Sequence, residues 1–227
     1  MRRIRELISE VEHCYPSDQF FRGIDKTLAS SSQAMATYMA YERAVRVLDR
    51  ESWTELKSKA LAHFLDHREG QLKQGFFNQL NEAFAYQHLV ARGFSSVRML
   101  RESGKKTPDI EYRDGNTVLS CEVKTLGISQ KQIARWEKKE AFSGSVYAEL
   151  STGYLKKLSS TVAKAQSQVQ AYQRSGLVYL VVLFDDFTLM HYAAYRRQIK
   201  NAFRTFEVPY IYAKIGLVGH RRIEKRG

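Results

Sequence analysis

The chain has 227 residues, which suits one domain of ordinary size with a small additional part. Hydrophobic residues make up 44% of the chain and only three residues are proline, which excludes an intrinsically disordered protein. The formal net charge of +12 favours a polyanionic partner, nucleic acid before a membrane surface, although charge that only keeps the protein in solution is a simpler alternative.

The two cysteines, Cys14 and Cys121, lie far apart in the sequence, which indicates a reducing compartment and no disulfide framework. Arg2, Arg3 and Arg5 are not followed by an apolar run, so we see no signal peptide. No window is apolar enough for a membrane-spanning helix. We therefore expect a cytoplasmic protein that does not bind a membrane.

The N-terminal third reads as a helical extension over residues 1–70. Apolar residues recur at helical spacing over 1–13 and 33–49, and another helix follows almost at once. Ser52 and Glu55 fit a capping box, with Ser52 as the N-cap of that helix. Because the extension carries no motif of its own, a protein that acts in assembly or interaction through these helices is one alternative to an enzyme.

The longest convincing helix is predicted over residues 71–91, and Gly93 is placed to end it. A strand is expected directly afterwards, over residues 94–100. Glu82 lies within this helix, where a surface glutamate is the ordinary expectation because glutamate is favoured in helices.

Residues 107–125 predict two short strands joined by a tight turn at Asp114-Gly115-Asn116, because these residues tolerate positive φ. Side chains alternate between the two faces of a strand. In the second strand one face therefore carries Leu119, Cys121 and Val123, and the other carries Ser120, Glu122 and Lys124.

The hairpin can bring Asp109 near Glu122, with Lys124 on the same face as Glu122. Two close carboxylates repel each other, and a hard divalent cation such as Mg²⁺ relieves that repulsion. A neighbouring ammonium can activate water and stabilise charge on a phosphate. The alternative is a surface hairpin on which Glu122 and Lys124 simply face water.

Basic residues surround this stretch and are candidates for nucleic-acid binding. They lie in the turn before Pro108 and in an irregular insert over residues 127–153, where an aromatic residue stands among them: Lys105, Lys106, Lys131, Arg135, Trp136 and Lys138. Phosphates pair with such cations and a base can stack on the ring. A solvated turn and an exposed helix of mixed charge are the alternatives.

A further helix is predicted over residues 155–174, where apolar residues are spaced by three and four. Gln168 lies at the edge of its apolar stripe, with Tyr172 one turn later. Lys164, one turn earlier, is a further candidate for nucleic-acid binding. Gln166 and Gln170 are the alternatives to Gln168 if the register is shifted.

The segment 177–184 is continuously apolar, which predicts a central strand that is buried on both faces. A helix over 190–204, a strand over 208–218 and a basic tail over 220–227 complete the chain. The tail could add salt-sensitive affinity for nucleic acid.

Three features together resemble the PD-(D/E)xK nuclease superfamily. Pro108-Asp109, followed at the appropriate spacing by Glu122-Val123-Lys124, is similar to its signature. Gln168-x-x-x-Tyr172 resembles a motif of the RecB-like and lambda-exonuclease-like branch. The predicted order of helix, three strands, helix and strand is similar to the αβββαβ core of that superfamily. The resemblance covers roughly residues 71–185.

The resemblance implies an α/β fold, with a mixed central sheet flanked by helices and a nuclease-like domain over residues 71–219. It also implies that Asp109 and Glu122 bind Mg²⁺, for which Mn²⁺ could substitute, with the Val123 carbonyl as a further ligand. Lys124 would position or deprotonate the attacking water. In the same way, Glu82 would support the metal, Gln168 would orient Lys124 or the phosphate, and Tyr172 would secure the helix.

The activity implied is hydrolysis of DNA, duplex or single-stranded, leaving a 5′-phosphate. Exonuclease and endonuclease action are both open, as are sequence preference and oligomeric state. A non-cleaving nucleic-acid-binding protein of the same fold is the second alternative to this enzyme.

Overall fold

The computed structural model describes residues 1–67, 72–101, 107–127, 138, 148–172, 175–184, 191–208 and 210–225. The helices in these ranges are α1 (Arg2–Cys14), α2 (Ile24–Ser30), α3 (Ser32–Val45), α4 (Arg50–Ala62), α5 (Gln74–Ala91), α7 (Thr152–Tyr172) and α9 (Tyr192–Arg204). The strands are β1 (Ser95–Met99), β2 (Ile110–Asp114), β3 (Thr117–Leu126), β4 (Gly176–Val182), β5 (Tyr210–Ile215) and β6 (Arg222–Lys225).

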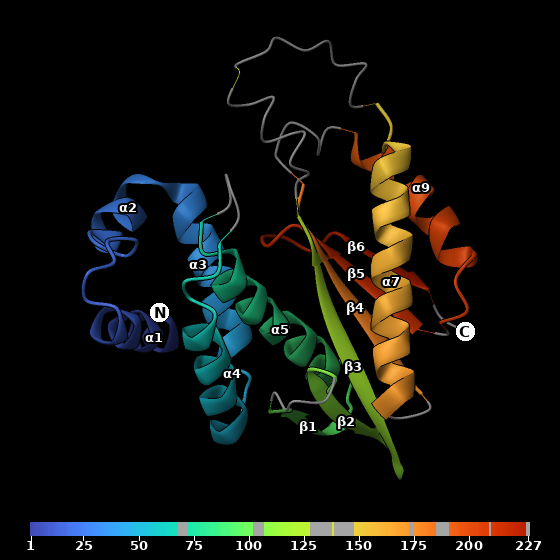
Figure 1. Ribbon diagram of the computed structural model, residues 1–227, viewed down its shortest axis with the longest axis horizontal. Coiled ribbons are helices and arrows are strands. Elements are labelled where there is room, and N and C mark those ends of the chain that lie inside the picture. The colour runs from blue at the N-terminus through green and yellow to red at the C-terminus, as the bar shows by residue number, and fades with distance from the viewer. Residues whose placement is uncertain are drawn as a thin grey trace. The chain divides into compact units, whose positions relative to one another are not determined.

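The fold belongs to the α/β class, as the sequence predicts. The six strands in the described ranges form one mixed open sheet in the order β1-β2-β3-β4-β5-β6, with helices at its flanks (Figure 1). Within the described ranges, α5, β1, β2, β3, α7 and β4 follow one another in the predicted order of helix, three strands, helix and strand. Among the helices of the described ranges, none is long and apolar enough to cross a membrane.

The chain divides into two compact units. Unit 1 comprises Met1–Lys105 and Asp109–Val118, and unit 2 comprises Lys106–Pro108 and Leu119–Gly227. Unit 1 therefore holds α1 to α5 with the β1–β2 pair, and unit 2 holds α7 and α9 with most of β3 and all of β4 to β6.

In unit 1, the N-terminus of α1 is capped by a side chain from another helix. The carboxylate of Glu42, on α3, accepts hydrogen bonds from the backbone N–H groups of Arg2 (2.9 Å) and Ile4 (3.0 Å). The first N–H groups of a helix lack intrahelical partners, and a negative charge there is favourable. The buried Glu42 is thus explained by the helix end that it satisfies.

The start of α4 corrects one sequence prediction. Asp49, not Ser52, is the N-cap, and its carboxylate accepts from the backbone N–H of Ser52 at 2.7 Å. The Ser52 hydroxyl donates to the Asp49 carboxylate at 3.3 Å and accepts a hydrogen bond from the N–H of Met99 in β1 at 3.1 Å. The Tyr86 hydroxyl of α5 donates to the Val97 carbonyl of β1 at 2.8 Å. These bonds fix β1 against α4 and α5.

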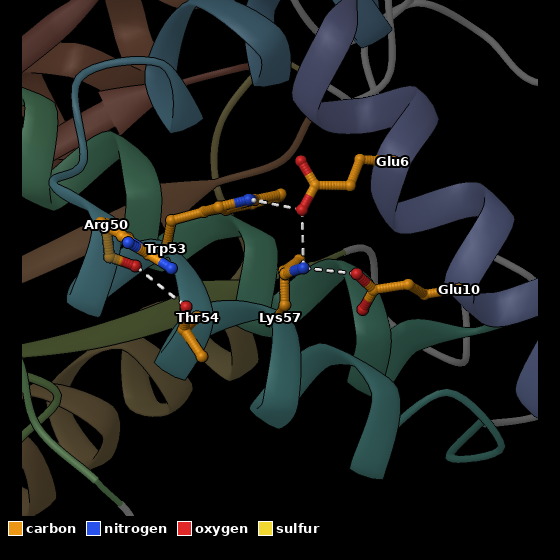
Figure 2. A network of polar contacts seen from close by, with 6 residues as sticks. All are labelled: Glu6, Glu10, Arg50, Trp53, Thr54 and Lys57. Carbon is orange, nitrogen blue, oxygen red and sulfur yellow. Dashed lines mark hydrogen bonds and ion pairs between the residues drawn. The ribbon is translucent and has the colours of Figure 1, made fainter.

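A polar network joins α1 to α4 on the surface of unit 1 (Figure 2). The Lys57 ammonium contacts the carboxylates of Glu6, at 2.6 Å, and Glu10. The Trp53 indole N–H also donates to Glu6, at 3.2 Å. The hydrogen bond from Lys57 lowers the pKa of Glu6, burial opposes that change, and the bond from Trp53 adds to it.

This network predicts a loss of stability in acid. A carboxyl group whose pKa is lowered in the folded protein stabilises the fold at every pH above its pKa in the unfolded chain, which is 4.5 for Glu6. This stabilisation is lost as the pH falls through the pKa of the folded protein. We expect the unfolding free energy to decrease as the pH is lowered from 5 towards about 3. The Glu6→Gln variant should show a shallower decrease, measured by urea titrations across that range. Equal slopes for the two proteins would contradict this role of Glu6.

Unit 2 is built on strands that are buried on both faces. β4 pairs in parallel with β3 on one side and with β5 on the other, and β6 pairs antiparallel with β5. All residues of β4 are buried, which confirms the central strand predicted from its continuous apolar sequence. The chain end differs from the sequence prediction: within the expected basic tail, residues 222–225 form β6, and Ile223 is buried.

One face of this sheet is covered by α7 and α9 (Figure 1). The core beneath them joins apolar residues of the two helices and of the strands, among them Leu158, Val162, Ile199, Phe203, Val178, Leu180 and Ile211. At the start of β4, a Cβ at Gly176 would lie 2.0 Å from the Ser120 carbonyl oxygen of β3 and 2.8 Å from Val169 of α7. Only glycine fits there.

Candidate functional site

The acidic and basic side chains of β3 lie on the face of the sheet that α7 covers. Glu122 is the register partner of Val178, and Lys124 is the partner of Leu180. Register partners in a parallel pair present their side chains to the same face, and Val178 and Leu180 belong to the core under α7. The alternation predicted for this strand is therefore confirmed.

Glu122 and Lys124 contact each other directly. The Lys124 ammonium donates a hydrogen bond to Glu122 Oε1. Glu122 is 0% exposed, whereas the Lys124 side chain remains 35% exposed. The alternative in which both residues face water is thus wrong for Glu122. Burial of a carboxylate lowers the stability of the fold unless charged or polar partners compensate its charge. The Lys124 ammonium, which hydrogen-bonds Glu122 Oε1, is such a partner.

Gln168 contacts the segment that precedes Asp109. Its side-chain amide donates to the backbone carbonyl of Thr107 at 2.8 Å, and the next residue, Pro108, is buried. Proline restricts the backbone of the residue before it, so Thr107 is held both by its neighbour and by α7. Gln168 therefore contacts the main chain of the residue before Pro108.

Asp109 belongs to unit 1, directly before β2. It is half-buried, and its backbone carbonyl accepts a hydrogen bond from the N–H of Leu100 at 2.9 Å. The turn that follows β2 has the predicted character, because Gly115 adopts a φ of +55°. The hydrogen bond from Leu100 thus holds the main chain of Asp109 directly before β2, where the sequence predicts the start of a strand.

Glu82 lies on α5 in unit 1 and forms a buried ion pair. The Lys59 ammonium, from α4, lies 3.0 Å from Glu82 Oε2, and the two side chains are 3% and 6% exposed. The alternative of a surface glutamate is therefore wrong. Whatever else Glu82 does, its charge is balanced by a cation from the neighbouring helix.

The other predicted residues stand apart from these contacts. Lys164 and Tyr172 are exposed on α7, and Lys138 is exposed as well. The remaining basic and aromatic candidates, Lys105, Lys106, Lys131, Arg135 and Trp136, lie outside the described residues.

Glu122, in unit 2, and Asp109, in unit 1, each carry carboxylate oxygens, the type of ligand that Mg²⁺ prefers. Over the part of the chain that the structure describes, no group of three or more His, Cys, Asp or Glu residues is gathered as a metal site would need. A cage made entirely of protein ligands is thus not found in those residues.

Sequence reasoning missed two residues of interest. Lys59 occupies the apolar side of α4, next to Leu56 and Ala60, and a lysine at such a position is a signal of a buried partner. Ser120 precedes Glu122 on the same face of β3, is fully buried, and its hydroxyl has no hydrogen-bond partner among the described residues. No pattern in the sequence points to Ser120.

Comparisons of the chain with models of protein families, with curated proteins and with solved structures returned no match.

Proposed function

We propose that this protein is a metal-dependent nuclease that hydrolyses phosphodiester bonds of DNA. The observation that carries the proposal is the Glu122–Lys124 pair on β3, in which a carboxylate without any exposure contacts a lysine that remains accessible. A buried acid next to a reachable amine is the arrangement expected where a phosphate and an attacking water are to be handled.

Two further observations support the proposal. The α/β fold with a six-stranded mixed sheet is compatible with a restriction-endonuclease-like αβββαβ core. The Gln168 amide binds the Thr107 carbonyl, so the glutamine of the Gln-x-x-x-Tyr motif and the residues that precede Asp109 are in contact. The motifs that are distant in the sequence are thus connected in part by a direct hydrogen bond.

In the proposed reaction, Asp109 and Glu122 would be the residues that hold Mg²⁺ or Mn²⁺, and the metal would supply stabilisation of charge on the phosphate. Lys124 would orient the attacking water and would face the negative charge that develops on the phosphate. Gln168 would hold the main chain at Thr107, two residues before Asp109. Glu82 has a supporting role for the metal in this proposal.

The test is incubation of the purified chain with linear duplex, circular duplex and single-stranded DNA and with RNA, each with Mg²⁺, with Mn²⁺ and with EDTA. We expect cleavage of at least one DNA substrate that requires the metal ion and yields 5′-phosphate ends. Cleavage of the circular substrate distinguishes an endonuclease from an exonuclease. Binding of DNA without any cleavage under either metal would refute the enzyme and favour the non-cleaving alternative.

A further inference from the structure

Basic side chains gather on one surface of unit 2, on α9 and at the beginning of β6. The apolar side of α9 is buried in the core through Tyr195, Ile199 and Phe203. The opposite side is exposed and carries only small, polar or basic residues. We call the following six exposed residues the α9–β6 surface: Arg196, Arg197, Lys200, Arg204, Arg221 and Arg222.

The two parts of this surface are adjacent. The guanidinium of Arg221 lies 5.7 Å from the centroid of the Tyr192 ring at the start of α9. The Tyr192 hydroxyl lies 3.5 Å from the carbonyl oxygen of Arg222. Burial raises the pKa of Tyr192, and the charges of Arg196 and Arg221 act in the opposite direction, so both guanidinium groups lie within electrostatic reach of one ring.

This concentration of charge is unfavourable for the isolated chain. Arg196, Lys200 and Arg204 are spaced by four residues, and like charges at this spacing repel each other on a helix. In the β5–β6 pair, Lys214 stands directly opposite Arg222, which is also a destabilising arrangement. One carboxylate of the described residues, Glu224, lies 3.6 Å from Arg222, and α9 itself contains no acidic residue.

The sequence around this surface explains much of the charge of the protein. Residues 191–225 contain eight Arg and Lys residues and two Glu residues, which gives a net charge of +6 within a total of +12. A polyanion bound at the α9–β6 surface would offset the repulsion among its basic side chains, because it brings negative charge close to them.

The chemistry of the surface favours phosphate over a lipid bilayer. Helices that bind membranes insert an apolar face into the interface, but the apolar face of α9 is already buried in its own core. Five of the six residues of the α9–β6 surface are arginine, whose planar guanidinium makes paired hydrogen bonds to phosphate oxygens. A charged surface without apolar groups suits the backbone of a nucleic acid.

We propose that the α9–β6 surface binds the phosphate backbone of DNA, without sequence preference and without a metal ion. The choice of DNA rests on the proposed function, but the binding itself does not require catalysis. The surface would hold the substrate through charge, while the chemistry occurs elsewhere on the protein.

The experiment measures binding of a short labelled duplex in EDTA over a series of salt concentrations. One variant carries Arg196→Gln, Arg197→Gln, Lys200→Gln and Arg204→Gln, and a second carries Arg221→Gln and Arg222→Gln. The matched control removes four exposed arginines from unit 1, at positions 43, 46, 50 and 92, so its change in net charge equals that of the α9 variant. Circular dichroism confirms that each protein is folded.

We expect the α9 variant to bind roughly tenfold to a hundredfold more weakly near physiological salt, with a log–log salt slope smaller by about three to four. In the β6 variant, which loses two charges instead of four, the decrease in the salt slope should be about half as large. The unit 1 control should bind the duplex with the affinity of the unmodified protein. Equal affinity in the α9 variant and the control would overturn the inference. So would stronger binding to vesicles of anionic lipid than to the duplex, because a membrane would then be the partner.

The outcome is distinguishable from that of the proposed function, because binding is measured without metal. Salt-sensitive binding that depends on the α9–β6 surface, in a protein that cleaves no DNA, would uphold this inference and refute the hydrolase. Metal-dependent cleavage of DNA by the unmodified protein, together with full affinity of the α9 variant for DNA, would uphold the hydrolase and refute this inference.

Discussion

In the proposed nuclease, replacement of Lys124 by alanine should lower the rate of Mg²⁺-dependent DNA cleavage by at least about a thousandfold, because the amine assigned to the water and to the developing phosphate charge is lost. Binding of DNA in EDTA should change little, since this is one cation on a strongly basic protein. The measurement is the single-turnover rate on the substrate that the unmodified protein cleaves best. A Lys124→Ala protein with full activity would contradict the proposed mechanism.

Controls are needed because Lys124 also compensates the buried charge of Glu122. Its removal is expected to reduce stability, so unfolding is followed in parallel. The double variant Glu122→Gln, Lys124→Ala removes the carboxylate as well and should recover stability, yet remain inactive. Lys156→Ala, at an exposed position of α7, removes one positive charge from the same unit and should retain activity.

Replacement of Lys59 by methionine should destabilise unit 1 by about 3–5 kcal/mol, because it removes the buried ammonium that contacts Glu82. Removing one member of a buried ion pair lowers the free energy of unfolding by more than the intact pair adds to it. The reason is that the remaining charge is left without water and without that partner. Urea titration of the unmodified and Lys59→Met proteins measures the loss. A decrease below about 1 kcal/mol would show that the pair carries little energy.

The double variant Lys59→Met, Glu82→Leu separates the ion pair from the packing of its two side chains. Both charges are absent in this protein, so most of the lost stability should return. Together with Glu82→Leu alone, the variants form a double-mutant cycle that isolates the coupling between the two groups. A coupling energy near zero would mean that each residue is held by other contacts.

The order of the elements could be predicted from the sequence because it depends on local spacing. The apolar stripes of α5 and α7 and the continuous apolar run of β4 define their secondary structure without knowledge of distant residues. α2 was missed because it has seven residues and buries only Leu28, which leaves no periodicity to detect. β6 was missed because its basic residues conceal a single buried position, Ile223.

The environment of the candidate residues could not be predicted in the same way. A Glu-x-Lys sequence on a strand is the same whether the carboxylate is exposed or buried, and the burial of Glu122 depends on residues that are distant in the sequence. The partner of Glu82 is likewise set by the packing of α4 against α5. The cap of α4 was misassigned because Asp49 and Ser52 are both good capping residues, and the choice follows from β1, which takes the Ser52 hydroxyl.

The bond between Gln168 and Thr107 has a consequence for sequence variation. The acceptor is a backbone carbonyl, which every amino acid possesses, whereas the donor is an amide at the end of a long side chain. This bond therefore restricts the choice of residue at position 168 and imposes no such restriction at position 107. In relatives that keep this contact, we expect glutamine at position 168. The hydrogen bond places no such restriction on the side chain at position 107, before the proline.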